Sequence, residues 1–203
     1  AFRDFESATY WNGIYSNADK KLVKLAQAKS ESQLRHFMKQ HGQPLGDFIP
    51  DWDMRWNPLS KITLDQKKRK LNTFKPSRYL ARPCVPQSTV PPTIDYVIRH
   101  VVGGDPDVYE HFLNWLAVIV QTLGMTQTAW VLHGTQGTGK GLLFNKVLTP
   151  LFGEENVTAR RMEELGSDFT EFMKNKFVVF VDEVQAGDSF FYDKVAAKLK
   201  NLI

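Results

Sequence analysis

The segment GTQGTGKG runs from Gly134 to Gly141, after the apolar run AWVLH and before the run LLFNKVL. It follows the G-x-x-x-x-G-K pattern of phosphate-binding loops, in which glycines turn backbone N–H groups toward a phosphate and the lysine reaches its outer oxygens. The flanking runs predict a strand ending at the loop and a helix from Lys140 towards Leu151. A glycine-rich turn without a ligand is the competing interpretation. The predicted nucleotide site comprises Gly134, Thr135, Gln136, Gly137, Thr138, Gly139, Lys140 and Gly141.

A second motif, FVVFVDEV, begins at Phe177 and carries two acids at the end of an apolar run. In α/β sheets, ligands bind at the carboxyl ends of the strands. We therefore predict that Asp182 holds Mg²⁺, through water, and that Glu183 orients or deprotonates the water that attacks the γ-phosphate. Lys140 and Glu183 are the predicted catalytic residues. A solvated chain reversal is the alternative interpretation of the acidic pair.

The order of the segments predicts an α/β fold. Helices are expected over Thr93–Val102 and Asp105–Gly124, with Asp105 as the N-cap and Pro106 in the first helical position. Strands and helices then alternate through both motifs, which favours parallel strands. Five prolines between Lys75 and Pro92 indicate an extended connector. The predicted domains are a basic helical and hairpin region at 1–80, a linker at 81–92 and an ATPase domain at 93–203.

The N-terminal region has a less distinct pattern. Apolar residues at three- and four-residue spacing predict an amphipathic helix or helix pair over Ala18–Gln40. Residues Gln43–Leu59 are rich in Pro, Gly, Asp and Trp, which indicates a loop or short irregular strands. KITL and KLNTF, at Lys61–Leu64 and Lys70–Phe74, alternate around the tip DQKKR and predict a β-hairpin.

Charge divides the chain into two halves. The net charge is +4, but residues 1–100 carry +8 and residues 101–203 carry −4. A basic N-terminal half suits a partner that carries phosphate groups. The basic run at the hairpin tip fits either a solvated turn or contact with the phosphate backbone of DNA. The residues of that run are Lys67, Lys68, Arg69 and Lys70.

Composition excludes several classes of protein. Apolar residues make up 42% and charged residues 24% of the chain, which argues against disorder, collagen and coiled coil. One cysteine, Cys84, can form neither an internal disulfide nor a zinc finger and favours a reducing cytoplasm. The longest apolar stretch, Phe112–Leu123, is too short for a membrane span. Because the chain begins with Ala1 rather than Met, we expect it to be part of a longer protein.

Together the two motifs and the preceding helix, YEHFLNWLAVIVQTLG, resemble a superfamily 3 helicase domain over about residues 93–203. The match is closest to the helicase part of phage and plasmid primase-helicase or primase-polymerase proteins. LNTFKPSRYL, at Leu71–Leu80, also resembles the segment before the motor in those proteins. The resemblance implies a hexameric ring ATPase of AAA+ type that uses ATP and Mg²⁺ to translocate on single-stranded DNA.

Carried over by residue, the resemblance assigns two sets of positions. Gly134, Gly137, Gly139 and Lys140 match the phosphate loop of the family, and Asp182 and Glu183 match its acidic motif. If the chain is encoded by a phage, the host cytoplasm is the expected location.

Two departures from the family change the expectation. Gly141 stands where the family has Ser or Thr, whose hydroxyl ligates Mg²⁺, so metal binding should be weaker. The chain also stops at Ile203, before the family's DNA-contacting hairpin, polar sensor and arginine finger, so we expect an incomplete sheet and little turnover from this stretch alone. Arg160 and Arg161 fit either a solvated loop or contact with the nucleotide of a neighbouring subunit.

Three functions stay open at this point. The first is an ATP-driven helicase motor of a phage-type replication protein. The second, which Gly141 favours, is a catalytically weak nucleotide- or DNA-binding module that holds a ring together. The third is a phosphate-loop kinase of a small metabolite, which the basic N-terminal region and the acid pair make less suitable.

Overall fold

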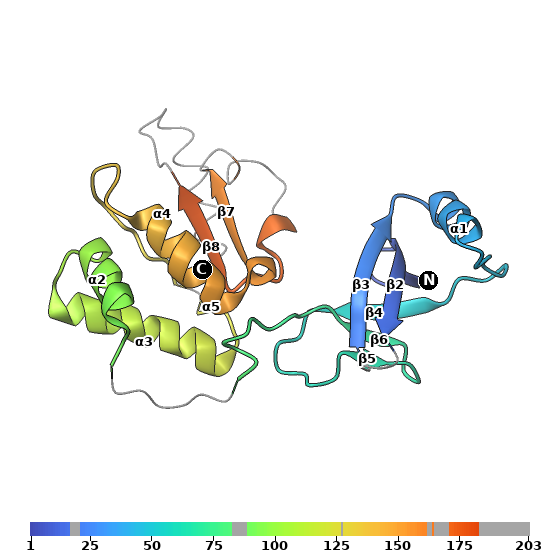
Figure 1. Ribbon diagram of the computed structural model, residues 1–203, viewed down its shortest axis with the longest axis horizontal. Coiled ribbons are helices and arrows are strands. Elements are labelled where there is room, and N and C mark those ends of the chain that lie inside the picture. Colours follow the sequence, from blue (N-terminus) through green and yellow to red (C-terminus); the bar gives the residue numbers. More distant parts are fainter. Residues whose placement is uncertain (17–20, 83–88, 127, 162–163, 165–170, 183–203) are drawn as a thin grey trace. The chain divides into compact units, whose positions relative to one another are not determined.

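The computed structural model describes residues 1–16, 21–82, 89–126, 128–161, 164 and 171–182. The chain forms two compact units, Ala1–Phe74 and Lys75–Ile203, and Figure 1 shows their elements. No helix among the described residues is both long enough and apolar enough to cross a membrane.

The first unit is a mixed six-stranded sheet with one helix. Its strand order is β3-β2-β1-β4-β6-β5. β1, β2 and β3 pair antiparallel, β4 runs parallel to both β1 and β6, and β5 pairs antiparallel with β6. The bounds are β1 Phe2–Asp4, β2 Tyr10–Ser16, β3 Lys21–Ala28, α1 Glu31–Gln40, β4 Asp51–Arg55, β5 Leu64–Asp65 and β6 Lys70–Asn72.

The helix predicted over Ala18–Gln40 is wrong in its first half. Lys21–Ala28 forms strand β3, which pairs with β2 along its length. The apolar spacing of this stretch suits either structure, and the antiparallel neighbour decides the outcome because it supplies partners for the backbone N–H and C=O groups. The helix begins only after Ser30, whose side chain accepts a hydrogen bond from the backbone of Gln33 at 3.2 Å.

Other predictions for this unit hold. The hairpin is confirmed, with Leu64 opposite Leu71 and Asp65 opposite Lys70. The irregular stretch before it contains one strand, β4. On β1, the buried Asp4 carboxylate accepts hydrogen bonds from the Ser7 backbone at 2.8 Å, the Ser7 hydroxyl at 2.5 Å and the Met54 backbone at 3.1 Å. This carboxylate therefore ties β1 to its own turn and to β4.

The second unit contains helices and a pair of parallel strands. The predicted helices are confirmed as α2 Pro92–Val101 and α3 Pro106–Thr122, and the Asp105 side chain caps α3 with Pro106 at its first position. The helix after the glycine-rich segment is continuous from α4 Lys140–Leu142 through a π-helical turn, η1 Leu143–Leu148, into α5 Thr149–Phe152. It is followed by η2 Glu154–Asn156, β7 Val157–Arg161, η3 Glu171–Met173 and β8 Val178–Asp182.

The parallel sheet is smaller than the sequence predicts. β7 and β8 pair in parallel as a two-stranded sheet. Among the described residues no strand pairs with residues 129–133, so the strand predicted just before the glycine-rich segment is not formed. A strand requires a neighbour for its backbone hydrogen bonds, and an apolar run alone does not supply one. The larger parallel sheet of the predicted fold class stays a prediction.

The boundary between the units also differs from the predicted linker at 81–92. Residues 75–81 belong to the second unit, where the Ser77 hydroxyl donates to the Leu151 carbonyl at 2.5 Å. The buried Asn156 amide donates to the carbonyls of Lys75 and Phe152, at 2.8 and 2.9 Å. The Lys75 ammonium lies 2.8 Å from a Glu155 oxygen. We call residues 75–81 the strap, because they bind the end of the α4–α5 helix.

Candidate nucleotide site

The glycine-rich segment forms a tight loop at the start of the α4–α5 helix. Gly137 and Gly139 have φ angles of +84° and +86°, a conformation that side chains with a Cβ rarely adopt. The Lys140 ammonium folds over this loop and donates to the carbonyls of Gly134 and Thr135 and to the Thr138 hydroxyl, each at 3.1 Å. The structure thus brings the predicted lysine and loop together at a helix N-terminus, where the backbone dipole favours an anion.

The last turn of helix α2 packs against the loop. A Cβ added at Gly139 would lie 3.5 Å from the Val101 side chain, so the last turn of α2 contacts the loop. An Asp95–Arg99–Tyr109 cluster joins α2 to α3: Arg99 donates to Asp95 at 2.9 Å and lies over the Tyr109 ring, whose hydroxyl also donates to Asp95. The hydrogen bond from Arg99, followed by that from Tyr109, lowers the pKa of Asp95 below its ordinary value.

The π-helical turn ends two residues before a proline. Pro150 has no backbone N–H, and in a regular α-helix its ring would clash with the carbonyl four residues earlier. The Thr149 N–H bonds to Phe144, five residues back, so the helix is wider in this turn. This turn places Leu143, Phe144 and Leu148 in the core.

A ring contact links the loop helix to the acidic strand. Phe144 stacks on Phe180 of β8, with centroids 4.8 Å apart and planes 16° apart. Phe144 lies one turn after Lys140, and Asp182 lies two residues after Phe180, on the same face of the strand. Figure 1 shows that the helix begins at the edge where β7 and β8 end. Lys140 and Asp182 therefore lie at one edge of the unit.

The acidic motif is described only in part. Asp182 is exposed at the end of β8. Glu183, the predicted base, lies outside the described residues. Among the described residues no cluster of three or more His, Cys, Asp or Glu side chains is placed to hold a metal ion. A magnesium ion at this edge would need oxygens from phosphate and water beside Asp182.

Gly141 has room for a side chain. The nearest atom to an added Cβ is the Asn145 amide nitrogen at 4.0 Å, and the φ angle is not positive. The missing hydroxyl is thus a property of the sequence, and the backbone does not require glycine at this position.

The two arginines lie on strand β7 and not in the loop that the sequence suggested. Arg160 forms an ion pair with Glu164 at 3.4 Å and lies 5.2 Å from the centre of the Phe172 ring. Arg161 is exposed and stands in register with Asp182. This neighbour could not be predicted from the sequence, because the register between two strands cannot be read from a run of residues.

The basic run lies at the hairpin tip of the first unit. Arg69 has a φ of +50°, and the Lys70 ammonium lies 3.8 Å from an Asp53 oxygen. Within the described residues, Lys67, Lys68 and Arg69 form no ion pair, and all three are exposed. These side chains are available to phosphate groups.

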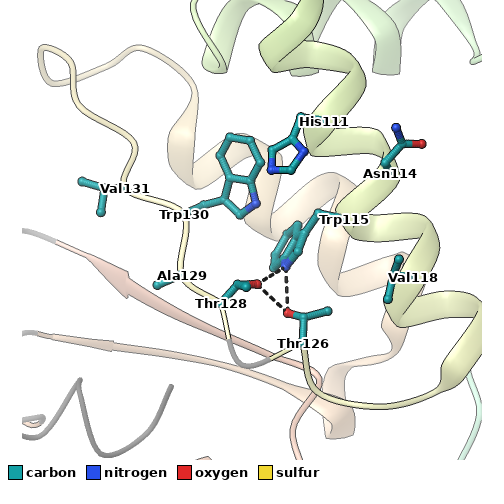
Figure 2. A pocket seen from close by; sticks show the side chains of 9 residues that line it. All are labelled: His111, Asn114, Trp115, Val118, Thr126, Thr128, Ala129, Trp130 and Val131. Atoms are coloured by element: carbon teal, nitrogen blue, oxygen red, sulfur yellow. Dashed lines mark hydrogen bonds between the residues drawn. The ribbon is translucent and has the colours of Figure 1, made fainter.

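A separate groove lies between α3 and residues 126–131 (Figure 2). It measures about 550 Å³ and has two indole rings in its wall. The Trp115 indole N–H lies within bonding distance of the hydroxyls of Thr126 and Thr128, at 2.8 and 2.9 Å, and Trp130 packs edge-on against Phe112. Val131 at the rim is 88% exposed. No residue lining the groove belongs to the phosphate loop, and the sequence offered no signal for it beyond the apolar runs.

Comparison with known proteins gives a match to one family model, a phage relative and solved structures of the C-terminal region of NrS-1. Residues 132–203 match a family described only as a family of unknown function, DUF5906. The chain is 29% identical over 142 residues to a DNA primase-polymerase of Nitratiruptor phage NrS-1, an alignment that covers 70% of this chain and 18% of the phage protein. The chain is therefore homologous to part of a phage primase-polymerase and spans less than a fifth of its length.

Solved structures agree with that relationship. An apo structure of the NrS-1 C-terminal region matches with a TM-score of 0.76 and 25% identity, over 98% of this chain and 46% of that one. An A-form apo structure of the same region matches with a TM-score of 0.69 and 26% identity, over 91% and 43% of the two chains. The resemblance to superfamily 3 helicases stays a prediction.

Proposed function

We propose that this chain binds ATP with Mg²⁺ on the Gly134–Gly141 loop and is part of a helicase motor in a phage-type replication protein. The observation that carries the proposal is the loop itself: positive φ angles at Gly137 and Gly139 and the Lys140 ammonium held over the loop at a helix N-terminus. The homologous phage primase-polymerase supports the replication context.

The proposed chemistry follows from the edge where Lys140 and Asp182 lie. Lys140 would exchange its three bonds to loop oxygens for bonds to the outer phosphates, which are better acceptors because they are charged. Asp182 would hold Mg²⁺ through water, and the ion would neutralise phosphate charge as the terminal phosphoryl group leaves. In this scheme Glu183 receives a proton from the attacking water.

DNA and self-association complete the proposal. Single-stranded DNA is the proposed partner, with its phosphates contacted by Lys67, Lys68, Arg69 and Lys70 at the hairpin tip. Coupled translocation would use a ring of copies, with a hexamer as the expected form. The resemblance to superfamily 3 helicases and the exposure of this basic tip support these assignments.

A second candidate is a module that binds nucleotide or DNA and stabilises a ring with little turnover. Gly141 favours it, because the residue after the lysine offers no hydroxyl to the metal. The two candidates differ in hydrolysis and agree in nucleotide binding.

Titration with a fluorescent ATP analogue, together with ATP turnover in the presence and absence of single-stranded DNA, tests the proposal. Lys140→Ala should abolish binding with an unchanged circular dichroism spectrum, because the ammonium contacts only loop oxygens. Lys146→Ala is the matched control, since it removes one exposed lysine from the same helix. Equal affinity in the Lys140 and Lys146 variants would refute the phosphate loop.

Turnover separates the two candidates. Glu183→Gln should keep nucleotide binding and lose hydrolysis, since the amide cannot accept the proton but does not alter the metal acid. DNA-stimulated turnover that Glu183→Gln removes supports the motor. Tight binding without turnover, measured in the full-length protein because little turnover is expected from this stretch alone, supports the ring module.

A further inference from the structure

Strand β7 ends in two arginines whose environments differ. Arg160 donates to the Ala159 carbonyl at 3.1 Å, pairs with Glu164 and lies against Phe172. The Arg161 backbone N–H also bonds to Glu164, at 3.2 Å, but among the described residues its guanidinium has no hydrogen bond, ion pair or ring contact. Consecutive residues of a strand point to opposite faces of the sheet, so the two guanidinium groups lie on opposite faces and have different neighbours.

The pairing of β7 and β8 shows which face Arg161 occupies. Ala159 stands opposite Phe180, and Arg161 stands opposite Asp182. Phe180 stacks on Phe144 of the loop helix, so this face of the strands is the one that the helix covers. Arg161 and Asp182 follow at the edge of that face, where the helix begins with Lys140. Arg160 lies on the other face.

The charges at this edge suit a triphosphate. Lys140 and Arg161 supply two cations, and Asp182 supplies one carboxylate for a metal ion. Gly141 removes the hydroxyl that would otherwise hold that ion, which leaves more phosphate charge to be balanced by other groups. A guanidinium presents a planar set of N–H donors that matches two phosphate oxygens, and it stays charged at all working pH values.

We propose that Arg161 donates to the terminal phosphate of the nucleotide bound on the loop of its own chain, beside the metal held by Asp182. The inference rests on the proposed function. It makes Arg161 a specificity-determining residue that distinguishes a nucleoside triphosphate from a diphosphate, since the diphosphate lacks the group that Arg161 contacts. Arg160, on the opposite face, has no such role.

Affinities for the Mg²⁺ complexes of ATPγS and ADP, measured by calorimetry on the whole chain, test this assignment. Arg161→Ala should weaken ATPγS binding at least about tenfold, the range for a lost hydrogen bond between charged groups, and leave ADP affinity within about twofold. Arg161→Lys should recover part of the lost ATPγS affinity, because an ammonium keeps the positive charge but lacks the two parallel N–H donors of a guanidinium. Arg160→Ala is the matched control and should change neither affinity.

The outcomes distinguish a failure of the Arg161 contact from a failure of nucleotide binding on the loop. If the unchanged chain binds neither nucleotide, the proposed function fails and the inference fails with it. If the unchanged chain binds both, and Arg161→Ala matches Arg160→Ala for ATPγS, Arg161 does not contact the terminal phosphate and the proposed function stands. Equal losses for ATPγS and ADP in Arg161→Ala would also overturn the contact, because they would show that Arg161 acts through Asp182 or through folding.

Discussion

Removing the Asn156 side chain should release the strap from the loop helix. Asn156 is 1% exposed, and its amide donates to a buried carbonyl, that of Phe152, and to a partly buried one, that of Lys75. The Phe152 carbonyl belongs to the last turn of the helix, where no intrahelical donor remains. A buried acceptor left unpaired costs about 1–3 kcal/mol and a partly buried bond about 0.5–1.5 kcal/mol. Asn156→Ala should therefore lower the opening free energy of the strap by about 1.5–4.5 kcal/mol.

Hydrogen exchange reports this change better than a melting curve, because the chain has two units and need not unfold in one step. The backbone N–H of Ala81, which donates to Ser77 at 2.9 Å, lies within the strap. A loss of about 1.5–4.5 kcal/mol corresponds to an acceleration of at least about tenfold in the exchange of peptides covering 75–81. Asn145→Ala, which removes an exposed asparagine from the loop helix, is the control. Equal exchange in the two variants would show that Asn156 does not hold the strap.

Three further predictions concern metal, DNA and pH. Gly141→Ser should tighten binding of Mg²⁺-ATP in a calorimetric titration, because the added Cβ has room; an unchanged affinity would mean that another oxygen already serves the ion. Replacing Lys67, Lys68, Arg69 and Lys70 with Ala should reduce the salt slope of single-stranded DNA binding by up to about 3, at about 0.7 for each phosphate contact, and an identical slope would place the DNA elsewhere. Burial alone would raise the pKa of Asp4, but hydrogen bonds from Ser7 and Met54 hold it below its ordinary value of 3.8. The stability that this carboxylate adds is therefore present above pH 3.8 and lost as the pH falls through the lowered pKa. Asp4→Asn should destabilise the first unit at neutral pH, and the difference in unfolding free energy between variant and unchanged chain should shrink in acid. A difference that stays constant across an acid titration would contradict this.

Local patterns in the sequence predicted the features that local rules control. The glycines and lysine of the loop, the Asp105–Pro106 helix start and the hairpin around the basic tip depend on residues close in the chain, and the structure has all three. Capping side chains and positive φ angles act within a few residues, so their signals survive in a single sequence.

The predictions that failed depend on partners far along the chain. Lys21–Ala28 forms a strand because β2 lies beside it and pairs with it. Residues 129–133 do not form a strand, because among the described residues no strand pairs with them. The same reasoning explains Arg161. Its place opposite Asp182 follows from the register between β7 and β8. That register is set when the two strands pair, and neither strand's own sequence specifies it.

The strap also determines where mechanical load enters the second unit. The chain passes directly from Phe74 into Lys75, and the first contacts of the strap are with Leu151 at the far end of the loop helix and with Glu155 and Asn156 just after it. The near end of that helix carries Lys140. A pull on the chain at Phe74 would therefore act at one end of a helix whose other end holds the loop, with the π-helical turn at Leu143–Leu148 between them. The helix that presents Lys140 is thus also the element to which the strap is anchored.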